Sequence, residues 1–338
     1  YRCQSAVVDL RARGTQCFNP GGKLDGKAET RDSLTAMVPV ALLFWLVVEF
    51  ATYVNLTRYF FALPMADAWL PALGALLGLR LGIVTITWAF AWTYPSPAPR
   101  LPAWRYAAML IGEYLAFIAH FVLVLPFERL WMPADRLLPG RPTVLLVHGY
   151  GCSRGVWWFI RRRLEAAGYN VASVSLAPPY TSVGKMVPQL HERIEAVIAA
   201  SGVQQLTLVA HSMGGLVSRS YLARHGIARV NRLITLASPH QGSEMARIAI
   251  GQNAREMEPG SQWLRDLAAE PVKIPFVSVR TPHDNYVMPQ DNQRLPEARD
   301  VELAGIGHLA LLLSSRTADL IIRLCGEPLP RPEVQFRR

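Results

Sequence analysis

Residues 206–215, with the sequence LTLVAHSMGG, join an apolar run to a segment with a helical pattern. The run 206–209 predicts a β-strand. Ser212 then lies in a turn flanked by small residues, as in a nucleophile elbow, where a sharp strand-to-helix turn exposes a serine hydroxyl. Ala210 replaces the first glycine of the usual G-x-S-x-G pattern. We therefore predict Ser212 as a nucleophile, with the backbone N–H of Met213 free to bind an oxyanion.

The rest of the C-terminal half repeats this strand-and-helix plan. Helical patterns at 187–200 and 216–225 alternate with short apolar or β-branched runs. Such alternation indicates a mostly parallel sheet with helices on both faces. We expect an α/β domain over residues 143–326, with strands at 143–147, 171–175, 206–209, 232–237, 275–279 and 300–303.

Two further polar residues follow predicted strands and supply the partners that a nucleophilic serine needs. Asp284 follows the strand at 275–279, and His308 follows the strand at 300–303 in a glycine-flanked loop. The ends of parallel strands meet at one edge of a sheet, where ligand-facing residues gather. We predict a triad in which His308 is the base and Asp284 orients it. Asp291 is the alternative acid.

The segment VHGYG at 147–151 is the second candidate donor of an oxyanion hole. A His-Gly pair at a strand end lets the backbone turn sharply and present the Tyr150 amide. We therefore predict the amides of Tyr150 and Met213 as the two oxyanion donors. His148 has a structural role in this interpretation.

Two other histidines adjoin the predicted site without the right placement. His211 lies beside the nucleophile, so its side chain should point into neighbouring packing, and His283 precedes Asp284, which reverses the expected order. Residues 245–263 and 180–186 are candidate covers for an apolar acyl pocket, or simply surface helix and loop.

The N-terminal part has a different character. After a polar segment at 1–33, three apolar stretches within residues 34–131 are each long enough to cross a bilayer, at about 34–56, 70–92 and 107–127. Arg80 and Glu113 could form an interhelical pair, or Arg80 could mark a tilted span and Glu113 face the headgroups; His120 is also polar. A linker at 132–142 leads to the α/β domain, and a Pro/Arg-rich tail covers 327–338.

The charge pattern indicates a membrane rather than a nucleic acid as the partner. The chain has a net charge of +10 but only 18% charged residues, and it contains no nucleic-acid-binding motif. Six basic residues before the first span, with Arg100 and Arg105, favour a cytoplasmic N-terminus, so three spans would place the α/β domain in the periplasm. Arg129, Arg136 and Arg141 favour the opposite orientation. We expect a multi-pass protein of the bacterial inner membrane, leaning to a periplasmic domain.

Four patches give residues 142–325 a family resemblance: HGYG at 148–151, AHSMGG at 210–215, SPHQGS at 238–243 and GH at 307–308. This region resembles bacterial lipases and esterases of the α/β-hydrolase superfamily, and it is similar to GPI-inositol-deacylase-like hydrolases. The resemblance implies a Ser-Asp-His carboxylester hydrolase with Tyr150 and Met213 at the oxyanion positions. It also implies that the first strands of the full fold are missing, and it does not extend to the apolar helices.

Together these features predict a membrane-anchored serine hydrolase that cleaves acyl esters, with lipid-like esters as the expected substrates, through an acyl-enzyme without metal or organic cofactor. The cysteines Cys3, Cys17, Cys152 and Cys325 have no metal-binding spacing. Two alternatives stay open: a lipid acyltransferase that uses the same triad, and a catalytically inactive interaction module. The sequence does not indicate an oligomeric state.

Overall fold

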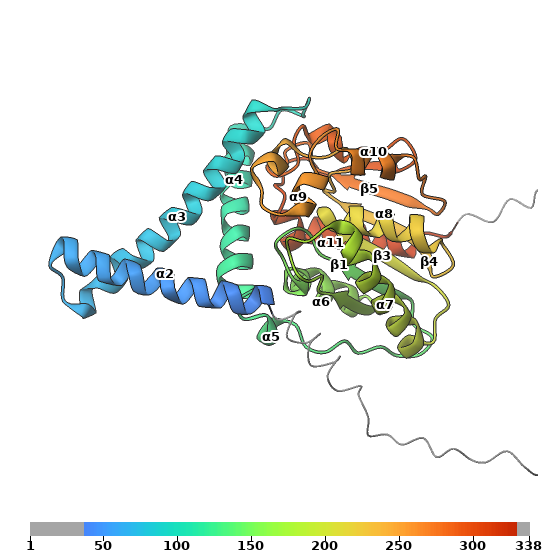
Figure 1. Cartoon of the computed structure of the whole chain (residues 1–338), viewed down its shortest axis with the longest axis horizontal. Coiled ribbons are helices and arrows are strands. Elements are labelled where there is room, and N and C mark those ends of the chain that lie inside the picture. The colour runs from blue at the N-terminus through green and yellow to red at the C-terminus, as the bar shows by residue number, and fades with distance from the viewer. Residues whose placement is uncertain (1–36, 330–338) are drawn as a thin grey trace, which may run out of the picture.

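The computed structural model describes residues 37–329, which form a helical N-terminal part and an α/β domain (Figure 1). Three long apolar helices come first, and each has the length and composition needed to cross a membrane. They are α2 (Met37–Phe61), α3 (Met65–Thr93) and α4 (Ala103–Ile118), which continues as the π-helical turn η1 (Ala119–Val124) before the short α5 (Glu128–Trp131).

The helices begin and end at other residues than the hydropathy indicated. Prolines mark two of the starts: Pro64 precedes α3 and Pro102 precedes α4, each at the N-cap. A proline there costs no hydrogen bond because the first N–H groups of a helix are free in any case. Helix α2 continues beyond residue 56 to Phe61, through an aromatic-rich end that is less apolar than the stretch before it.

The α/β domain contains a six-stranded sheet in the order β2-β1-β3-β4-β5-β6, in which every neighbouring pair is parallel. Each predicted strand is present, with ends shifted by at most two residues. The first half of the sheet consists of β1 (Thr143–Val147), β2 (Asn170–Val174) and β3 (Leu206–His211), and the second half of β4 (Val230–Leu236), β5 (Phe276–Arg280) and β6 (Arg299–Glu302).

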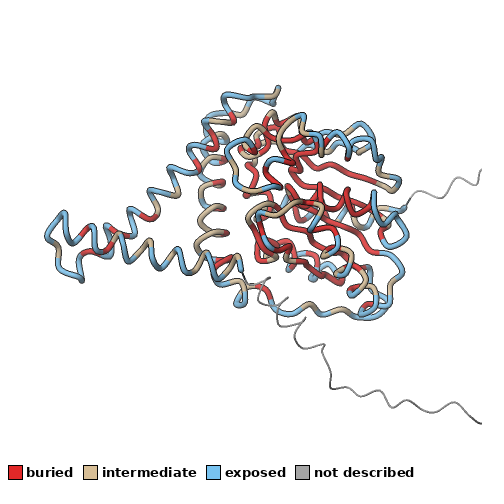
Figure 2. Tube along the Cα trace, viewed as in Figure 1, coloured by how far each residue is buried: buried red, intermediate tan, exposed pale blue. Residues whose placement is uncertain are grey.

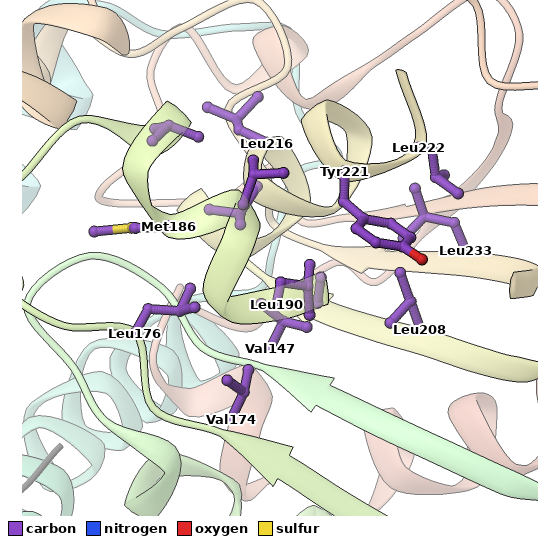
Figure 3. Packing of buried hydrophobic residues seen from close by; sticks show 14 of the residues in the cluster. Val147, Val174, Leu176, Met186, Leu190, Leu208, Leu216, Tyr221, Leu222 and Leu233 are labelled. Atoms are coloured by element: carbon purple, nitrogen blue, oxygen red, sulfur yellow. The ribbon is translucent and has the colours of Figure 1, made fainter. Parts of the chain in front are cut away.

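Helices cover both faces of this sheet. On one face α7 (Val183–Ser201) and α8 (Met213–His225) enclose a core that includes Val147, Leu190 and Leu208 (Figure 3). On the other face α6 (Trp158–Ala166) and α11 (Ser315–Gly326) pack on a second core. The strands are accordingly buried in the trace of Figure 2, apart from the edge strand β6. This double cover explains why the strands read as continuous apolar runs.

The helical part is attached to the α/β domain by packing as well as by the chain. Figure 1 shows α2 and α3 projecting away from the sheet and meeting at their far ends, whereas α4 runs beside the domain. Met288 of the domain is fully buried among Val84 and Trp88 of α3 and Met109 of α4. Of the two alternatives for Arg80 and Glu113, the interhelical pair does not occur: Arg80 forms its ion pair with Glu49 of α2, because α3 packs along α2 here.

Candidate active site

Ser212 occupies a strained turn between β3 and α8. Its backbone has φ 54° and ψ −128°, a conformation that L-residues rarely adopt, and its N–H donates to Leu236 O at 2.8 Å. The two glycines that follow are required by close contacts. A Cβ on Gly214 would lie 2.5 Å from Val147 O, and one on Gly215 would lie 2.2 Å from Ser238 Oγ. The sequence MGG thus lets α8 begin directly against the end of β1.

Asp284 and His308, the predicted acid and base, lie within hydrogen-bond distance of each other. His308 Nδ1 lies 2.9 Å from Asp284 Oδ2, and the aspartate has no exposed surface. The other oxygen of Asp284 accepts the N–H groups of Tyr286 and Val287, both at 2.7 Å. These bonds hold the carboxylate in one orientation. The alternative acid, Asp291, instead pairs with Arg294 at 2.8 Å.

The elbow and the histidine loop lie side by side. His211, the residue before Ser212, has its ring 4.5 Å from the ring of His308, and its Nε2 lies 3.2 Å from His308 O. His211 also packs edge-on against Trp157, as expected for a side chain directed into the interior. Burial, followed by the neighbouring His308, lowers the pKa of His211 well below the ordinary histidine value. His211 is therefore neutral beside the predicted base.

The loop at 147–151 passes directly over the nucleophile. A Cβ on Gly149 would lie 2.8 Å from Ser212 Cβ, so only glycine permits this approach. His148 Nε2 accepts the N–H of Leu176 at 2.9 Å, and burial lowers the pKa of His148 to about 4. The neutral imidazole of His148 thus holds the loop in place, in keeping with the structural role predicted for this residue. The predicted oxyanion residues Tyr150 and Met213 adjoin Gly149 and Ser212 in the chain.

The two predicted covers pack against each other beside this loop. The first contains η3 (Glu244–Ile248), α9 (Gln252–Glu256) and the start of α10 (Gln262–Ala268). Its Gln252 N–H donates to Tyr180 O in the second cover at 3.1 Å. The Tyr150 hydroxyl donates to Ile250 O at 2.6 Å and accepts Ile250 N–H at 3.0 Å. The side chain of Ile250 is 72% exposed, so this rim presents apolar surface to the surroundings.

Glu113 of α4 is a site residue whose position the sequence did not reveal. Its carboxylate is fully buried and accepts two backbone N–H groups. The N–H of Leu309 lies 2.9 Å from Oε1, and the N–H of Ala310 lies 2.9 Å from Oε2. These N–H groups come directly after His308. A Cβ on Gly307 would lie 2.5 Å from the carboxylate, so glycine is needed before the histidine as well. Glu113 therefore holds the loop that carries the predicted base.

Helix α3 reaches the same loop through a second chain of hydrogen bonds. Thr87 Oγ1 accepts from Asn285 Nδ2 at 2.8 Å, and Asn285 Oδ1 accepts the N–H of His308 at 3.2 Å. Asn285 was not predicted, although its place next to Asp284 offered a signal. The segment between α3 and α4 adds a third contact, in which Ser96 N–H donates to Gln290 Oε1 at 2.7 Å.

Within residues 37–329 there is no group of three or more histidines, cysteines or acidic residues arranged to hold a metal ion. Cys152 and Cys325 are free thiols, and burial raises the pKa of both to about 12. Cys3 and Cys17 lie outside the described residues. A mechanism without metal or cofactor stays a prediction.

Comparison with known proteins agrees with this architecture. Residues 142–270 match the family model described as alpha/beta hydrolase fold. The C-terminal domain has the α/β-hydrolase fold. In this α/β-hydrolase domain the sheet is parallel, as the sequence predicted, and Ser212 follows β3 and Asp284 follows β5. The three apolar helices lie outside the matched residues.

Two similar sequences and one similar solved structure are named as lipases. The chain is 30% identical over 157 residues to a triacylglycerol lipase of Burkholderia plantarii, covering 44% of this chain and 42% of that protein. It is 33% identical over 121 residues to one of Pseudarthrobacter phenanthrenivorans, covering 33% and 38%. The chain thus spans about two fifths of the length of these relatives. Among solved structures, Bacillus licheniformis lipase BlEst2 in mature form superposes with a TM-score of 0.52 at 20% identity, covering 58% of this chain and 96% of that one.

Proposed function

We propose that the protein is a membrane-anchored serine carboxylester hydrolase of the lipase or esterase type. The observation that carries this proposal is the buried contact of 2.9 Å between His308 Nδ1 and Asp284 Oδ2. The loop of His308 also contacts the strained elbow at Ser212 through His211. A base held by a buried acid beside an elbow serine is the arrangement that acyl transfer needs. The triacylglycerol lipases among the relatives support the same reaction class.

In the proposed reaction, Ser212 Oγ attacks the ester carbonyl while His308 Nε2 takes the hydroxyl proton. Asp284 keeps the proton of His308 on Nδ1 and stabilises the imidazolium that forms. The amides of Tyr150 and Met213 donate to the tetrahedral oxyanion. His308 then protonates the leaving alcohol, and a water molecule, activated by the same base, releases the acid from Ser212.

The proposed substrates are esters of lipids. The rim formed by the two covers exposes Ile248 and Ile250, and the candidate membrane helices pack directly on the domain. Apolar surface beside the site favours an acyl chain over a polar substituent. We also propose that the helices hold the protein in a bacterial inner membrane.

Labelling with a fluorophosphonate tests the nucleophile directly. We expect the wild-type protein in detergent or liposomes to be labelled once, and Ser212→Ala to remain unlabelled. Asp284→Asn should lower kcat for p-nitrophenyl butyrate by about 10⁴-fold. Asp291→Asn is the matched control, because Asp291 pairs with Arg294 away from the histidine, and it should retain the wild-type rate. A wild-type protein that is neither labelled nor active on esters would refute the proposal.

Product analysis separates hydrolysis from acyl transfer. Free fatty acid formed in the presence of an acceptor alcohol supports the hydrolase, whereas an acylated alcohol as the main product would make the protein an acyltransferase that uses the same residues.

A further inference from the structure

Helix α4 differs from the other two apolar helices in the way its polar residues are distributed. Glu113 and His120 are seven residues apart, so they share one face of the helix, and both are fully buried. Glu113 faces the α/β domain, where it binds the loop after His308. Large apolar side chains remain exposed elsewhere along α4 and η1, namely Trp104, Ile111, Leu115 and Leu123.

The position of Glu113 along the helix decides where α4 can lie in a bilayer. Glu113 is at the middle of the apolar stretch Ala103–Val124. If this stretch crossed the membrane, the backbone of Leu309 and Ala310 would lie at mid-bilayer depth, and with it the predicted triad. Irregular backbone and charged side chains are strongly disfavoured in hydrocarbon, so a spanning α4 is incompatible with its contacts.

The other two helices have no such conflict. The 25 residues of α2 extend about 37 Å, which exceeds the hydrocarbon thickness of about 30 Å. Residues 65–84 of α3 extend about 30 Å and match that thickness. The first side-chain hydrogen bond from α3 to the α/β domain comes after this length, at Thr87. Figure 1 shows both helices leaving the domain and meeting at a distant tip, with α4 across their base. Their internal charges, Glu49 and Arg80, neutralise each other.

We propose that α2 and α3 form a two-helix hairpin that crosses the bilayer, and that α4 lies in the membrane surface between the bilayer and the α/β domain. The exposed apolar face of α4 contacts lipid, as in other in-plane helices, and the α/β domain covers its polar face. The segment before α2 and the α/β domain are then on the same side of the membrane. If the proposed function is right, the catalytic edge of the sheet faces the leaflet that contains its ester substrates.

Two spans also remove the conflict among the basic residues. Six basic residues precede α2, and Arg100, Arg105, Arg129, Arg136 and Arg141 flank α4, so all lie on one side in this arrangement. The opposite end of the hairpin has one basic residue, Arg58 in the last turn of α2, and the tip at residues 62–64 has none. Because basic residues accumulate on the cytoplasmic side, this side is the cytoplasm. The proposal differs from the periplasmic placement expected for three spans.

Cysteine accessibility distinguishes the two arrangements without any need for enzymatic activity. Single cysteines are placed at Ala62, Arg100 and Glu270 in the full chain, after its four native cysteines have been replaced by alanine. A membrane-impermeant maleimide is then applied to spheroplasts and to inverted vesicles. We expect Arg100→Cys and Glu270→Cys to be labelled only in inverted vesicles. Ala62→Cys is the control for sidedness, because both arrangements place it opposite Arg100, and it should be labelled only in spheroplasts.

Labelling of Arg100→Cys and Glu270→Cys from opposite sides would overturn the proposal in favour of three spans. Labelling of both from the outside would overturn the cytoplasmic placement. These outcomes are independent of the proposed function, since an inactive protein would still give the expected pattern.

Depth measurements test the same arrangement with another readout. A fluorophore on Trp104→Cys, Ile111→Cys or Leu123→Cys is quenched by lipids that carry nitroxides at known depths, in liposomes of phosphatidylethanolamine and phosphatidylglycerol. We expect the three positions to be equally deep, near the interface. A central depth for Ile111→Cys with shallow values for the other two would indicate a spanning helix, and absence of quenching at all three would mean that α4 does not contact the bilayer; either result would refute the proposal.

Discussion

Gly307→Ala tests whether the contact between α4 and the histidine loop matters for the reaction. The added Cβ would lie 2.5 Å from Glu113 Oε2, whereas ordinary contacts begin at 3.4 Å. The loop or the carboxylate must therefore move by about 0.9 Å, the difference between these distances. The backbone of Gly307 is not in the left-handed region, so alanine brings no torsional strain and the effect is steric alone.

The displacement cannot be absorbed by the glutamate alone. Although Oε2 is the end of a side chain, it accepts the N–H groups of Leu309 and Ala310, and moving it would sacrifice these bonds in a buried place. A shift of about 1 Å at a catalytic group can cost about 10²-fold in rate. We therefore expect kcat for p-nitrophenyl butyrate to fall about 10²-fold with little change in KM. Overpacking should also lower the free energy of unfolding by about 1–3 kcal/mol.

The assay is steady-state hydrolysis per active site, with the active fraction counted by fluorophosphonate titration. Gly112→Ala is the matched control, because it adds the same methyl group one residue before Glu113 in open space and should keep the wild-type rate. Combining Gly307→Ala with Glu113→Asp should restore part of the rate, since the shorter carboxylate leaves room for the methyl group. If Gly307→Ala alone keeps kcat within twofold of wild type, the reasoning is refuted.

Three further predictions concern other parts of the molecule. Because burial lowers the pKa of His148 from 6.5 to about 4, the unfolded chain binds this proton first as the pH falls. The free energy of unfolding should therefore decrease between pH 6.5 and 4, by about 1.4 kcal/mol per pH unit from this group. In urea titrations at several pH values, His148→Gln should show a weaker dependence of this free energy on pH. Tyr150→Phe keeps the predicted oxyanion amide but removes both bonds to Ile250, so thermal unfolding should occur at a lower temperature while kcat per site changes less than about 10-fold, and a larger loss would assign the hydroxyl a part in the reaction. Glu49→Leu should destabilise the helical part by leaving the charge of Arg80 unpaired, and the double variant with Arg80→Leu should recover stability in a thermal assay; equal stability of the single variant would show that the pair is dispensable.

Local patterns were sufficient to predict the sheet. The strand predicted at 143–147 has the same bounds in the structure, because each residue of β1 is buried and the run consists of apolar and β-branched residues. The elbow at Ser212 was predictable for a similar reason, since the turn geometry requires small residues at fixed positions. The pairing of Asp284 with His308 followed from the parallel topology, which brings the ends of β5 and β6 to one edge.

The partners of the polar residues in the apolar helices could not be predicted in this way. Arg80 selects Glu49 rather than Glu113 because of how α3 packs on α2, and helices that are apolar all round contain no signal for the direction of packing. Glu113 binds backbone amides, which have no side-chain identity to read in the sequence. Its partner Leu309 is 196 residues away, so hydropathy alone assigned α4 to the membrane.

Glu113 and Leu309 are 196 positions apart in the sequence, so the ribosome makes them at different times. At about 5–20 residues per second, a ribosome needs about 10–40 s to reach the histidine loop after Glu113 has been made. The proposed hairpin of α2 and α3 can therefore enter the bilayer before the strands of the α/β domain have been made and can cover α4. Until those strands have been made, the nascent chain lacks His308, so the order of synthesis delays assembly of the proposed active site.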